Sequence, residues 1–318
     1  MKKTTYIISV LVVLIVIVAE SLILINQNAE KTTVNIGYKK HVAYMPLFIA
    51  QEKGFFEQEG LTVNPIIFDS TNQMMAAVVS GDIDASLGGA NLQTVYSIEE
   101  KSPNSMKVFT TLDVNEDTGI TCVMVKSDSD ISSMSELEGK KSATLPGTFA
   151  PIWINAALKT VGLNKEDIEI QGLDAKLQLA ALESGQVDVV FTVEPACSFG
   201  VNKGIGKIIY TEPLRHLGSS LTASIISTKL IEENPNVADK IVAATDKAVD
   251  FIRENPEESM DIMAKYADYK PDSIKGMKTP VYSKSTEISE ENLQDLADKL
   301  YAEGDLASRL DVSRIIYK

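Results

Sequence analysis

The chain has few of the side chains that build metal sites and nucleophilic active sites. Its 318 residues include only two cysteines and two histidines. No CxxC or HExxH motif is present, and no Cys/His cluster has the spacing of metal ligands. The isolated Cys122 and Cys197 could pair in an exported protein, or could be buried as small hydrophobic residues. The sequence therefore predicts neither a metal nor another cofactor.

Basic residues are also in deficit. The chain has 30 Lys and Arg against 44 Asp and Glu, which gives a formal net charge of −14. This acidity argues against nucleic acid and anionic membrane surfaces as partners. It does not argue against a small anionic ligand, which responds to nearby N–H groups and side chains. Low-complexity tracts are absent too, and 44% hydrophobic residues are typical of a globular chain.

One apolar run stands at the N-terminus. Lys2 and Lys3 precede residues 6–19, which are apolar except for Ser9. This suits a signal peptide, with Ala-Glu-Ser at 19–21 as its cleavage site. Residues 7–25 could instead form an uncleaved anchor. No cysteine follows the run, so a lipoprotein-type anchor is excluded. We expect residues 1–29 to be a signal peptide or an N-terminal membrane anchor and the rest to be exported.

The remaining chain alternates between strand and helix patterns. Short loops separate them, which is typical of a parallel α/β sheet. The predicted strands lie near residues 34–36, 61–68, 83–87, 106–112, 120–125, 141–145, 168–173, 187–192, 207–211 and 217–227. The predicted helices lie near residues 46–53, 73–80, 91–100, 135–137, 151–160, 175–184, 236–254, 256–266, 271–277 and 289–303.

Two segments of the chain repeat each other. Residues 74–86, MMAAVVSGDIDAS, align with residues 178–190, QLAALESGQVDVV. In both, an apolar helix ends at Ser-Gly and a strand follows. Alanine-rich helices often end in glycine by chance, but the matching element order favours duplication. We therefore expect one lobe from residues 30–120 and 219–318, a second from residues 121–218, and a cleft between them.

The first strand–loop–helix unit, residues 34–56, offers a ligand site. Its polar and aromatic loop, residues 39–45, leads into a helix that we expect to begin at Pro46. A loop at this position leaves free N–H groups and the positive end of a helix dipole, which suits an anionic or carbonyl-bearing ligand. A plain connection without a ligand is the alternative.

The same unit carries a resemblance to a known family. The run Tyr44 to Phe56, YMPLFIAQEKGFF, then Glu-Gly-Leu at 59–61, Ser-Gly-Asp-Ile-Asp at 80–84 and Glu-Pro at 194–195, resembles ABC-transporter solute-binding proteins. The type is that of nitrate, sulfonate, taurine and bicarbonate binders, which also includes binders of pyrimidine thiamin precursors. The resemblance covers about residues 34–300.

The resemblance implies a type II periplasmic-binding-protein fold of the α/β class. Two α/β lobes would be joined by two hinge crossings, with the ligand between them and delivery to a membrane permease. We expect a monomer. The family's ligand contacts fall in the first loop, where His41 could donate or carry a cation and Tyr44 could contact the ligand. The alternative is a surface histidine and a packed tyrosine.

Other candidate ligand contacts lie at the ends of later strands. Asn72 stands at a helix start, although it could serve only as a cap. Gly89 and Asn91 belong to the segment 88–91, whose backbone N–H groups could approach a ligand closely. The alternative is that this segment is only a tight turn. In the second lobe, Thr148 can donate from its hydroxyl and its backbone.

Three further residues complete the predictions. Glu194 follows a buried strand, where a carboxylate needs a partner; it could accept from the ligand or bridge to the other lobe. Trp153 is predicted to be core, with a pocket wall as the alternative. Arg215 is predicted to form a surface salt bridge near the hinge, with bidentate binding of an anion as the alternative.

Two function classes follow. The first is a non-enzymatic receptor that captures a small anionic or zwitterionic solute by lobe closure, with a pyrimidine thiamin precursor as the alternative ligand. The second is an enzyme, because the family resembles fungal thiamin-pyrimidine synthases. Those enzymes carry a cysteine-rich motif and a cofactor lysine, and this chain has no clustered cysteines. The sequence therefore favours the receptor.

Overall fold

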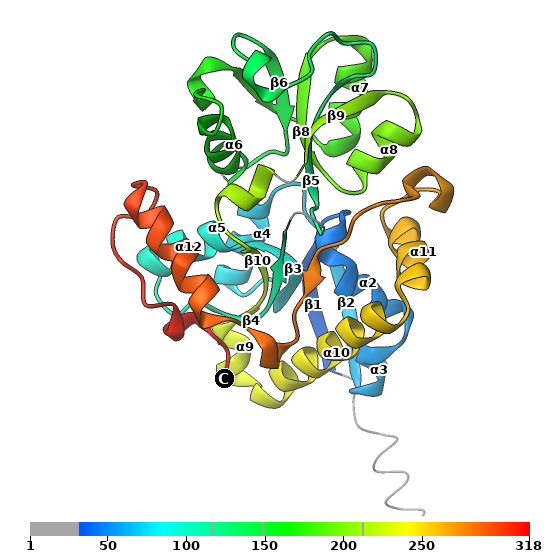
Figure 1. The fold of residues 1–318 in the computed structure, drawn as a ribbon. Coiled ribbons are helices and arrows are strands. Elements are labelled where there is room, and N and C mark those ends of the chain that lie inside the picture. Colours follow the sequence, from blue (N-terminus) through cyan, green and yellow to red (C-terminus); the bar gives the residue numbers. More distant parts are fainter. Residues whose placement is uncertain (1–31, 116–117, 148, 212) are drawn as a thin grey trace, which may run out of the picture.

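The computed structural model describes residues 32–115, 118–147, 149–211 and 213–318. These residues form two β-sheets, each with its own helices (Figure 1). We call the six-stranded sheet and its helices lobe 1, and the five-stranded sheet and its helices lobe 2. The export segment predicted at residues 1–29 lies outside the described residues. Within the residues described, no helix is both long and apolar enough to cross a membrane.

Lobe 1 has a mixed sheet with the strand order β11-β4-β10-β3-β1-β2. β1 pairs in parallel with β2 and β3, while β10 runs antiparallel between β3 and β4. β3 and β10 are buried almost throughout because they are central strands covered on both faces. The strands are β1 (Thr32–Tyr38), β2 (Leu61–Ile67), β3 (Ala85–Asn91), β4 (Met106–Asp113), β10 (Ser220–Ser227) and β11 (Val281–Tyr282).

Lobe 2 has a smaller mixed sheet with the order β7-β6-β8-β5-β9. β6 pairs in parallel with β7 and β8, and β5 runs antiparallel between β8 and β9. The strands are β5 (Thr121–Lys126), β6 (Lys141–Thr144), β7 (Glu169–Gly172), β8 (Val189–Val193) and β9 (Gly206–Thr211).

The chain passes between the sheets twice. The first passage lies between Asp113 and Thr121, and the second between Thr211 and Ser220. We propose lobe limits at residues 30–120, 121–218 and 219–318, as the sequence suggests. β10 supports this choice, because the return strand pairs with β3 and β4 of lobe 1 and with no strand of lobe 2 among the described residues.

Capping side chains and terminal glycines define the ends of two matching helices. The Ser70 hydroxyl caps α4 and Gly81 ends it at φ 79°; Asp174 caps α7 and Gly185 ends it at φ 76°. These are the two helices of the sequence repeat. The helices are α2 (Met45–Glu52), α3 (Phe55–Gln58), α4 (Thr71–Ser80), α5 (Leu92–Lys101), α6 (Phe149–Lys159), α7 (Ala175–Ser184), α8 (Ala196–Asn202), α9 (Thr228–Glu233), α10 (Pro235–Glu254), α11 (Pro256–Tyr266) and α12 (Glu290–Ala302).

The C-terminal helices cover lobe 1. α10 and α11 pack on α2, and α12 packs beside α5 on the other side of the sheet (Figure 1). The Tyr96 hydroxyl of α5 donates to the Leu293 carbonyl of α12 at 2.8 Å. Phe56 is fully buried and Phe55 packs against the core. These contacts attach the end of the chain to its first half.

Several elements differ from the sequence prediction. Residues 88–91, for which a tight turn was the alternative, continue strand β3, because β10 pairs with Ala90 and Asn91. Asn91 stands at the N-cap of α5 without a side-chain capping bond. The predicted helix at 271–277 is only a 3-10 turn, Pro271–Ile274. The short helices α3, α8 and α9 carry too few residues for a clear apolar period, so the sequence did not reveal them.

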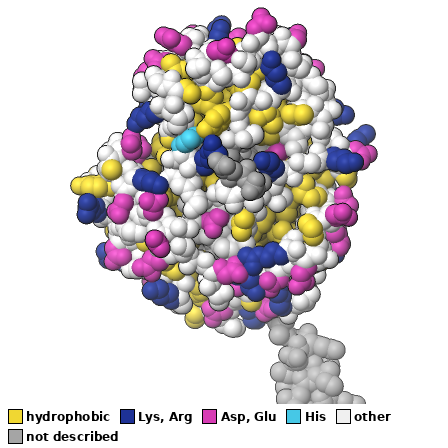
Figure 2. Space-filling model, viewed as in Figure 1, with side chains coloured by type: hydrophobic (Ala, Val, Ile, Leu, Met, Phe, Trp, Pro, Cys, Tyr) yellow, Lys and Arg dark blue, Asp and Glu magenta, His cyan; other side chains and the backbone are white. Residues whose placement is uncertain are grey.

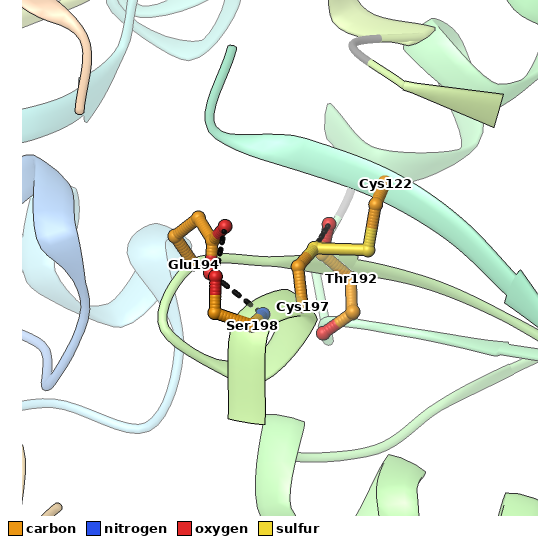
Figure 3. Close-up of a disulfide and its surroundings, with 5 residues drawn as sticks. All are labelled: Cys122, Thr192, Glu194, Cys197 and Ser198. Atoms are coloured by element: carbon orange, nitrogen blue, oxygen red, sulfur yellow. Dashed lines mark hydrogen bonds between the residues drawn. A yellow bond between two sulfur atoms is a disulfide. The ribbon is translucent and has the colours of Figure 1, made fainter. Parts of the chain in front are cut away.

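A disulfide joins Cys122 of β5 to Cys197 of α8 (Figure 3). Both sulfur-bearing residues are buried in lobe 2. The sequence left open whether these cysteines pair, because pairing depends on two positions separated by 75 residues coming together. The fold places their Cα atoms 6.1 Å apart, within the range that a disulfide spans.

Candidate functional site

A cavity of about 70 Å³ lies between the two lobes. A single buried water needs roughly 10–15 Å³, so the space can hold a small molecule. Strand ends and helix starts of both lobes line it. The lining residues from lobe 1 are Lys39, His41, Ala43, Thr71, Asn72, Gly89, Asn91 and Thr222, and those from lobe 2 with the adjoining crossing are Ile120, Thr121, Leu145, Pro146, Gly147, Ala150, Trp153 and Val193.

The lining differs in chemistry between the lobes. Lobe 1 supplies an ammonium, an imidazole, two amides and two hydroxyls, whereas lobe 2 supplies mainly hydrocarbon and one indole. None of the described lining residues is Asp or Glu. The outer surface shows no such separation: on the face drawn in Figure 2, charged side chains of both signs are spread over both lobes.

Lys39 brings a cation into this cavity. It follows β1 directly and is 9% exposed. Burial lowers the pKa of Lys39, while the charges of Asp174 and Asp69 act to raise it. Neither carboxylate forms an ion pair with Lys39, and within the described part of the chain its ammonium has no hydrogen-bond acceptor. A buried ammonium without an acceptor is costly, so this position favours an anion.

His41 lies beside Lys39 as a neutral donor. Its Nδ1 accepts from the Ala43 N–H at 3.3 Å, which leaves the proton of the neutral ring on Nε2. Burial, and then the charge of Lys39, lower the pKa of His41 to about 3. In the unliganded protein these two effects favour the neutral ring over the cation considered from the sequence, and a cation beside a bound anion stays a prediction. His41 lines the cavity as a hydrogen-bond donor.

Two more polar groups of lobe 1 lack protein partners in the cavity. The Thr222 hydroxyl of β10 is 8% exposed and forms no hydrogen bond with the described residues. The Asn91 side chain, at the end of β3, likewise makes no hydrogen bond within them. A buried hydroxyl that loses water without gaining a partner, as at Thr222, costs free energy, and a bound ligand would supply the missing partner.

Gly89 and Tyr44 form one unit in the cavity wall. Gly89 lines the cavity, whereas Tyr44 is fully buried behind it and is not a lining residue. A Cβ atom at Gly89 would lie 2.1 Å from Cζ of Tyr44. The glycine therefore lets the phenol pack against the strand backbone. A direct contact between Tyr44 and the ligand remains a prediction.

We expect Gly89→Ala to lower the free energy of unfolding by about 1–3 kcal/mol, because the new methyl must displace the Tyr44 ring. The double variant Gly89→Ala/Tyr44→Leu removes the ring atoms that the methyl meets. Its loss should be smaller than the sum of the two single losses. Urea denaturation of the four proteins measures this, and additive losses would contradict the contact.

Of the candidates Asn72 and Thr148, the structure describes only Asn72. Asn72 lines the cavity at the start of α4, where its backbone N–H donates to the Ser70 hydroxyl at 3.2 Å. Ser70, not Asn72, is thus the cap, and the Asn72 side chain is placed at the cavity. Thr148 lies outside the described residues, and its neighbour Gly147 lines the cavity.

Glu194 lies outside the cavity, on an adjoining groove that Thr121 and Lys278 also line. Its carboxylate accepts from the Ser198 hydroxyl at 2.9 Å and from the Ser198 N–H at 3.0 Å (Figure 3). Its carbonyl accepts from the Val42 N–H of lobe 1 at 3.3 Å. Burial raises the pKa of Glu194 to about 7, against hydrogen bonds from Ser198 and Lys278. Of the two roles weighed, this placement fits the bridge between lobes.

His41 and Glu194 should give stability opposite dependences on pH. A raised carboxyl pKa stabilises the fold at low pH, and this contribution is lost as pH rises through about 7. A lowered histidine pKa destabilises the fold as pH falls below 6.5. From about pH 7 to pH 5 each contribution is at most about 2 kcal/mol, with opposite sign.

Relative to the wild type, Glu194→Gln should therefore become less stable from about pH 7 to pH 5, and His41→Asn more stable, by up to about 2 kcal/mol each. Asparagine at position 41 keeps an acceptor for the Ala43 N–H. Urea unfolding at several pH values measures both differences. Parallel profiles for all three proteins would contradict the assignments.

The structure places Trp153 in the cavity wall and Arg215 outside it. Trp153 of α6 is 4% exposed, packs edge-on against Phe191 and also lines the cavity, so it is both core and wall. Arg215 lies after β9 with its guanidinium over the Tyr210 ring at 5.9 Å. It does not line the cavity.

A family model matches most of this sequence. The model, described as the NMT1-like family, matches residues 27–267, about three quarters of the chain. The chain belongs to the NMT1-like family. The resemblance inferred from the sequence is confirmed, because similar proteins include sulfonate binders and a nitrate binder.

Curated relatives of this NMT1-like chain are distant. A Brucella abortus protein named as a binding protein is 24% identical over 222 residues, which cover 69% of this chain and 66% of that protein, just under two thirds. A Bacillus subtilis protein named for binding aliphatic sulfonates is 26% identical over 241 residues, 74% of this chain and 69% of that one. A Candida albicans 4-amino-5-hydroxymethyl-2-methylpyrimidine phosphate synthase is 21% identical over 303 residues, 90% and 85% of the two chains.

Solved structures confirm the predicted fold. The alkanesulfonate-binding protein SsuA from Xanthomonas axonopodis pv. citri, bound to MOPS, matches with a TM-score of 0.74 at 20% identity over 91% of this chain and 99% of that one. The nitrate-binding protein NrtA from Synechocystis PCC 6803 matches with a TM-score of 0.68 at 18% identity, over 90% and 85%. This NMT1-like chain thus has the two-lobed periplasmic-binding-protein fold.

The predicted ligand contacts did not include several lining residues, among them the polar residues Lys39, Thr121 and Thr222. The sequence could have indicated Lys39 as a candidate, because it directly follows a strand, as Glu194 does. No local sequence pattern indicated the two threonines, because each lies within a strand whose pairing brings it to the cavity. His41, Asn72, Gly89 and Asn91 do meet at the cavity, whereas Glu194 and Tyr44 do not line it.

Proposed function

We propose that this protein is an exported, non-enzymatic receptor that captures a small anionic solute for an ABC importer. The observation that carries the proposal is the Lys39 ammonium, buried in the interlobe cavity with no acceptor from the described chain. Thr222 and Asn91 add polar side chains to the same cavity, and neither makes a side-chain hydrogen bond with the described residues. A neutral pyrimidine precursor would leave the ammonium uncompensated, so an anion of the sulfonate or nitrate class is the better fit.

Capture would proceed by lobe closure. The lobes touch through Val42 N–H to the Glu194 carbonyl, and through the Asn202 amide, which donates to the Lys275 carbonyl at 3.0 Å. A ligand in the cavity contacts both lobes only when they are together. It therefore shifts the equilibrium toward the closed form by its difference in affinity for the two forms. The closed receptor would then deliver the solute to a membrane permease.

Export is part of the proposal. The basic start and apolar run of residues 1–29 support it. The disulfide between Cys122 and Cys197 also supports it, because disulfides persist in oxidising compartments.

Isothermal titration of the purified protein with nitrate, bicarbonate, taurine, alkanesulfonates and a hydroxymethylpyrimidine tests the receptor. We expect at least one anion to bind and to be recovered chemically unchanged. Binding of the pyrimidine alone would transfer the assignment to a thiamin precursor. Conversion of any bound compound to a product would establish the enzyme alternative that the Candida albicans synthase represents.

A further inference from the structure

A segment of lobe 1 reaches across the boundary between the two lobes. Residues 268–278, which we call the strap, leave lobe 1 at the end of α11 and return to it before β11. Between these points the strap forms the 3-10 turn Pro271–Ile274, which packs against α8 of lobe 2 (the orange segment beside α8 in Figure 1). The strap therefore links the lobes in addition to the two chain crossings.

Tyr269 is the strap residue that packs against two helices of lobe 2. Its ring meets Phe199 of α8 edge-on with ring centroids 5.2 Å apart, and the Lys176 ammonium of α7 lies 5.1 Å from its centroid. An edge-to-face aromatic pair and a cation over a ring are both attractive. The Tyr269 hydroxyl forms no hydrogen bond within the described chain, so the ring itself makes the contact.

Asn202, at the C-terminal end of α8, adds polar contacts with the strap. Its amide donates to the Ser273 carbonyl at 3.3 Å and to the Lys275 carbonyl at 3.0 Å. The disulfide from Cys197 to Cys122 fixes α8 to strand β5 of its own lobe. Because α8 cannot move away with the strap, separation of the lobes has to break these contacts.

We propose that Tyr269 and Asn202 hold the lobes together from outside the ligand cavity, as positioning residues for lobe closure. Neither residue lines the cavity. Their contacts involve protein groups alone, so they stabilise the closed form of both the empty and the loaded protein. This inference goes beyond the proposed function, because the strap contacts are the same for any solute.

Trp153 provides a test that needs no solute. It is the single tryptophan of the chain, is 4% exposed and lines the cavity between the lobes, so opening exposes it to a soluble quencher. For unliganded protein that still unfolds cooperatively in urea, we expect the double variant Tyr269→Ala/Asn202→Ala to raise the acrylamide quenching constant about twofold or more.

Tyr269→Phe is the matched control for this measurement. It keeps the ring against Phe199 and loses only a hydroxyl that has no hydrogen bond within the described chain. Its quenching constant should equal that of the wild type. Wild-type quenching in the double variant, or raised quenching in Tyr269→Phe, would overturn the proposal.

The rate of solute release gives a second test, which also depends on the proposed receptor. Protein loaded with nitrate or propane-1-sulfonate is diluted rapidly and release is followed by Trp153 fluorescence. Tyr269→Ala should release the probe about tenfold faster than the wild type, Asn202→Ala about threefold faster, and Tyr269→Phe at the wild-type rate. Unchanged release from both alanine variants would contradict the strap. Failure of both probes to bind the wild type would count against the receptor, and the quenching result would still decide the role of the strap.

Discussion

Replacing Lys39 by methionine is expected to weaken binding of the anionic solute by a hundredfold or more. Removing one member of a buried, hydrogen-bonded charge pair costs roughly 2–5 kcal/mol, because the other charge is left buried and unpaired. A hundredfold change in Kd corresponds to about 2.7 kcal/mol. Titration calorimetry with the anion that binds the wild type measures the loss.

The neighbouring Lys40 provides a matched control. Its side chain is 39% exposed, and its ammonium pairs with Asp268 on the surface of lobe 1. An exposed ion pair contributes only about 0–1 kcal/mol, so Lys40→Met should change anion affinity by less than about fivefold. Equal losses from the two substitutions would show that the overall charge of the loop, and not the buried ammonium, attracts the anion.

Lys39→Met should also make the unliganded protein more stable. The substitution replaces a buried lysine, whose ammonium has no acceptor in the described part of the chain, with a side chain of similar length that needs none. Denaturation without anion measures this gain. A variant that loses both affinity and stability would indicate that Lys39 supports the fold, and would contradict its assignment as the group that binds the anion.

Replacing both Cys122 and Cys197 by alanine is expected to lower the free energy of unfolding by about 4 kcal/mol. The disulfide closes a separation of 75 residues, and a loop of this length removes entropy from the unfolded chain worth about 4 kcal/mol. Both side chains are buried, and alanine adds no polar group at either site. Urea denaturation of the oxidised wild type and the double variant measures the difference.

Wild-type protein treated with a reductant is the matched control, because it loses the bond and keeps both sulfur atoms. Its loss should account for most of that in the double variant. A difference below about 1 kcal/mol between oxidised and reduced wild type would contradict a stabilising disulfide of this loop length. The bond lies within lobe 2, so the unfolding transition of lobe 2 should carry the change.

Strand and helix identity followed largely from local patterns. α7 occupies residues 175–184, as predicted, because an aspartate cap, an apolar period and a terminal glycine all define it within the segment. The sequence did not show that residues 88–91 belong to a strand, because glycines in a short segment indicate a turn when only local sequence is considered. Pairing with β10, more than 130 residues later in the chain, makes the segment a strand.

The site was predictable where its residues end strands. His41, Asn72, Gly89 and Asn91 lie at positions that parallel strands bring to one sheet edge, and all four line the cavity. Glu194 met the same criterion but turns its carboxylate to Ser198 of its own lobe. Tyr44 packs behind Gly89. A strand end fixes where a side chain begins, and the packing around it decides where the functional group points.

The sequence by itself determined the two-lobed α/β fold and the family, because apolar period, caps and the run at 44–56 are local signals, whereas the ligand site in the first loop stays a prediction. Only the tertiary structure decided that Lys39 is buried with no acceptor among the described residues, that burial lowers the pKa of His41, and that Cys122 meets Cys197. It also set a polar wall of lobe 1 against the Trp153 wall of lobe 2. Burial and charge partnership depend on residues distant in the chain, so no local pattern can specify them.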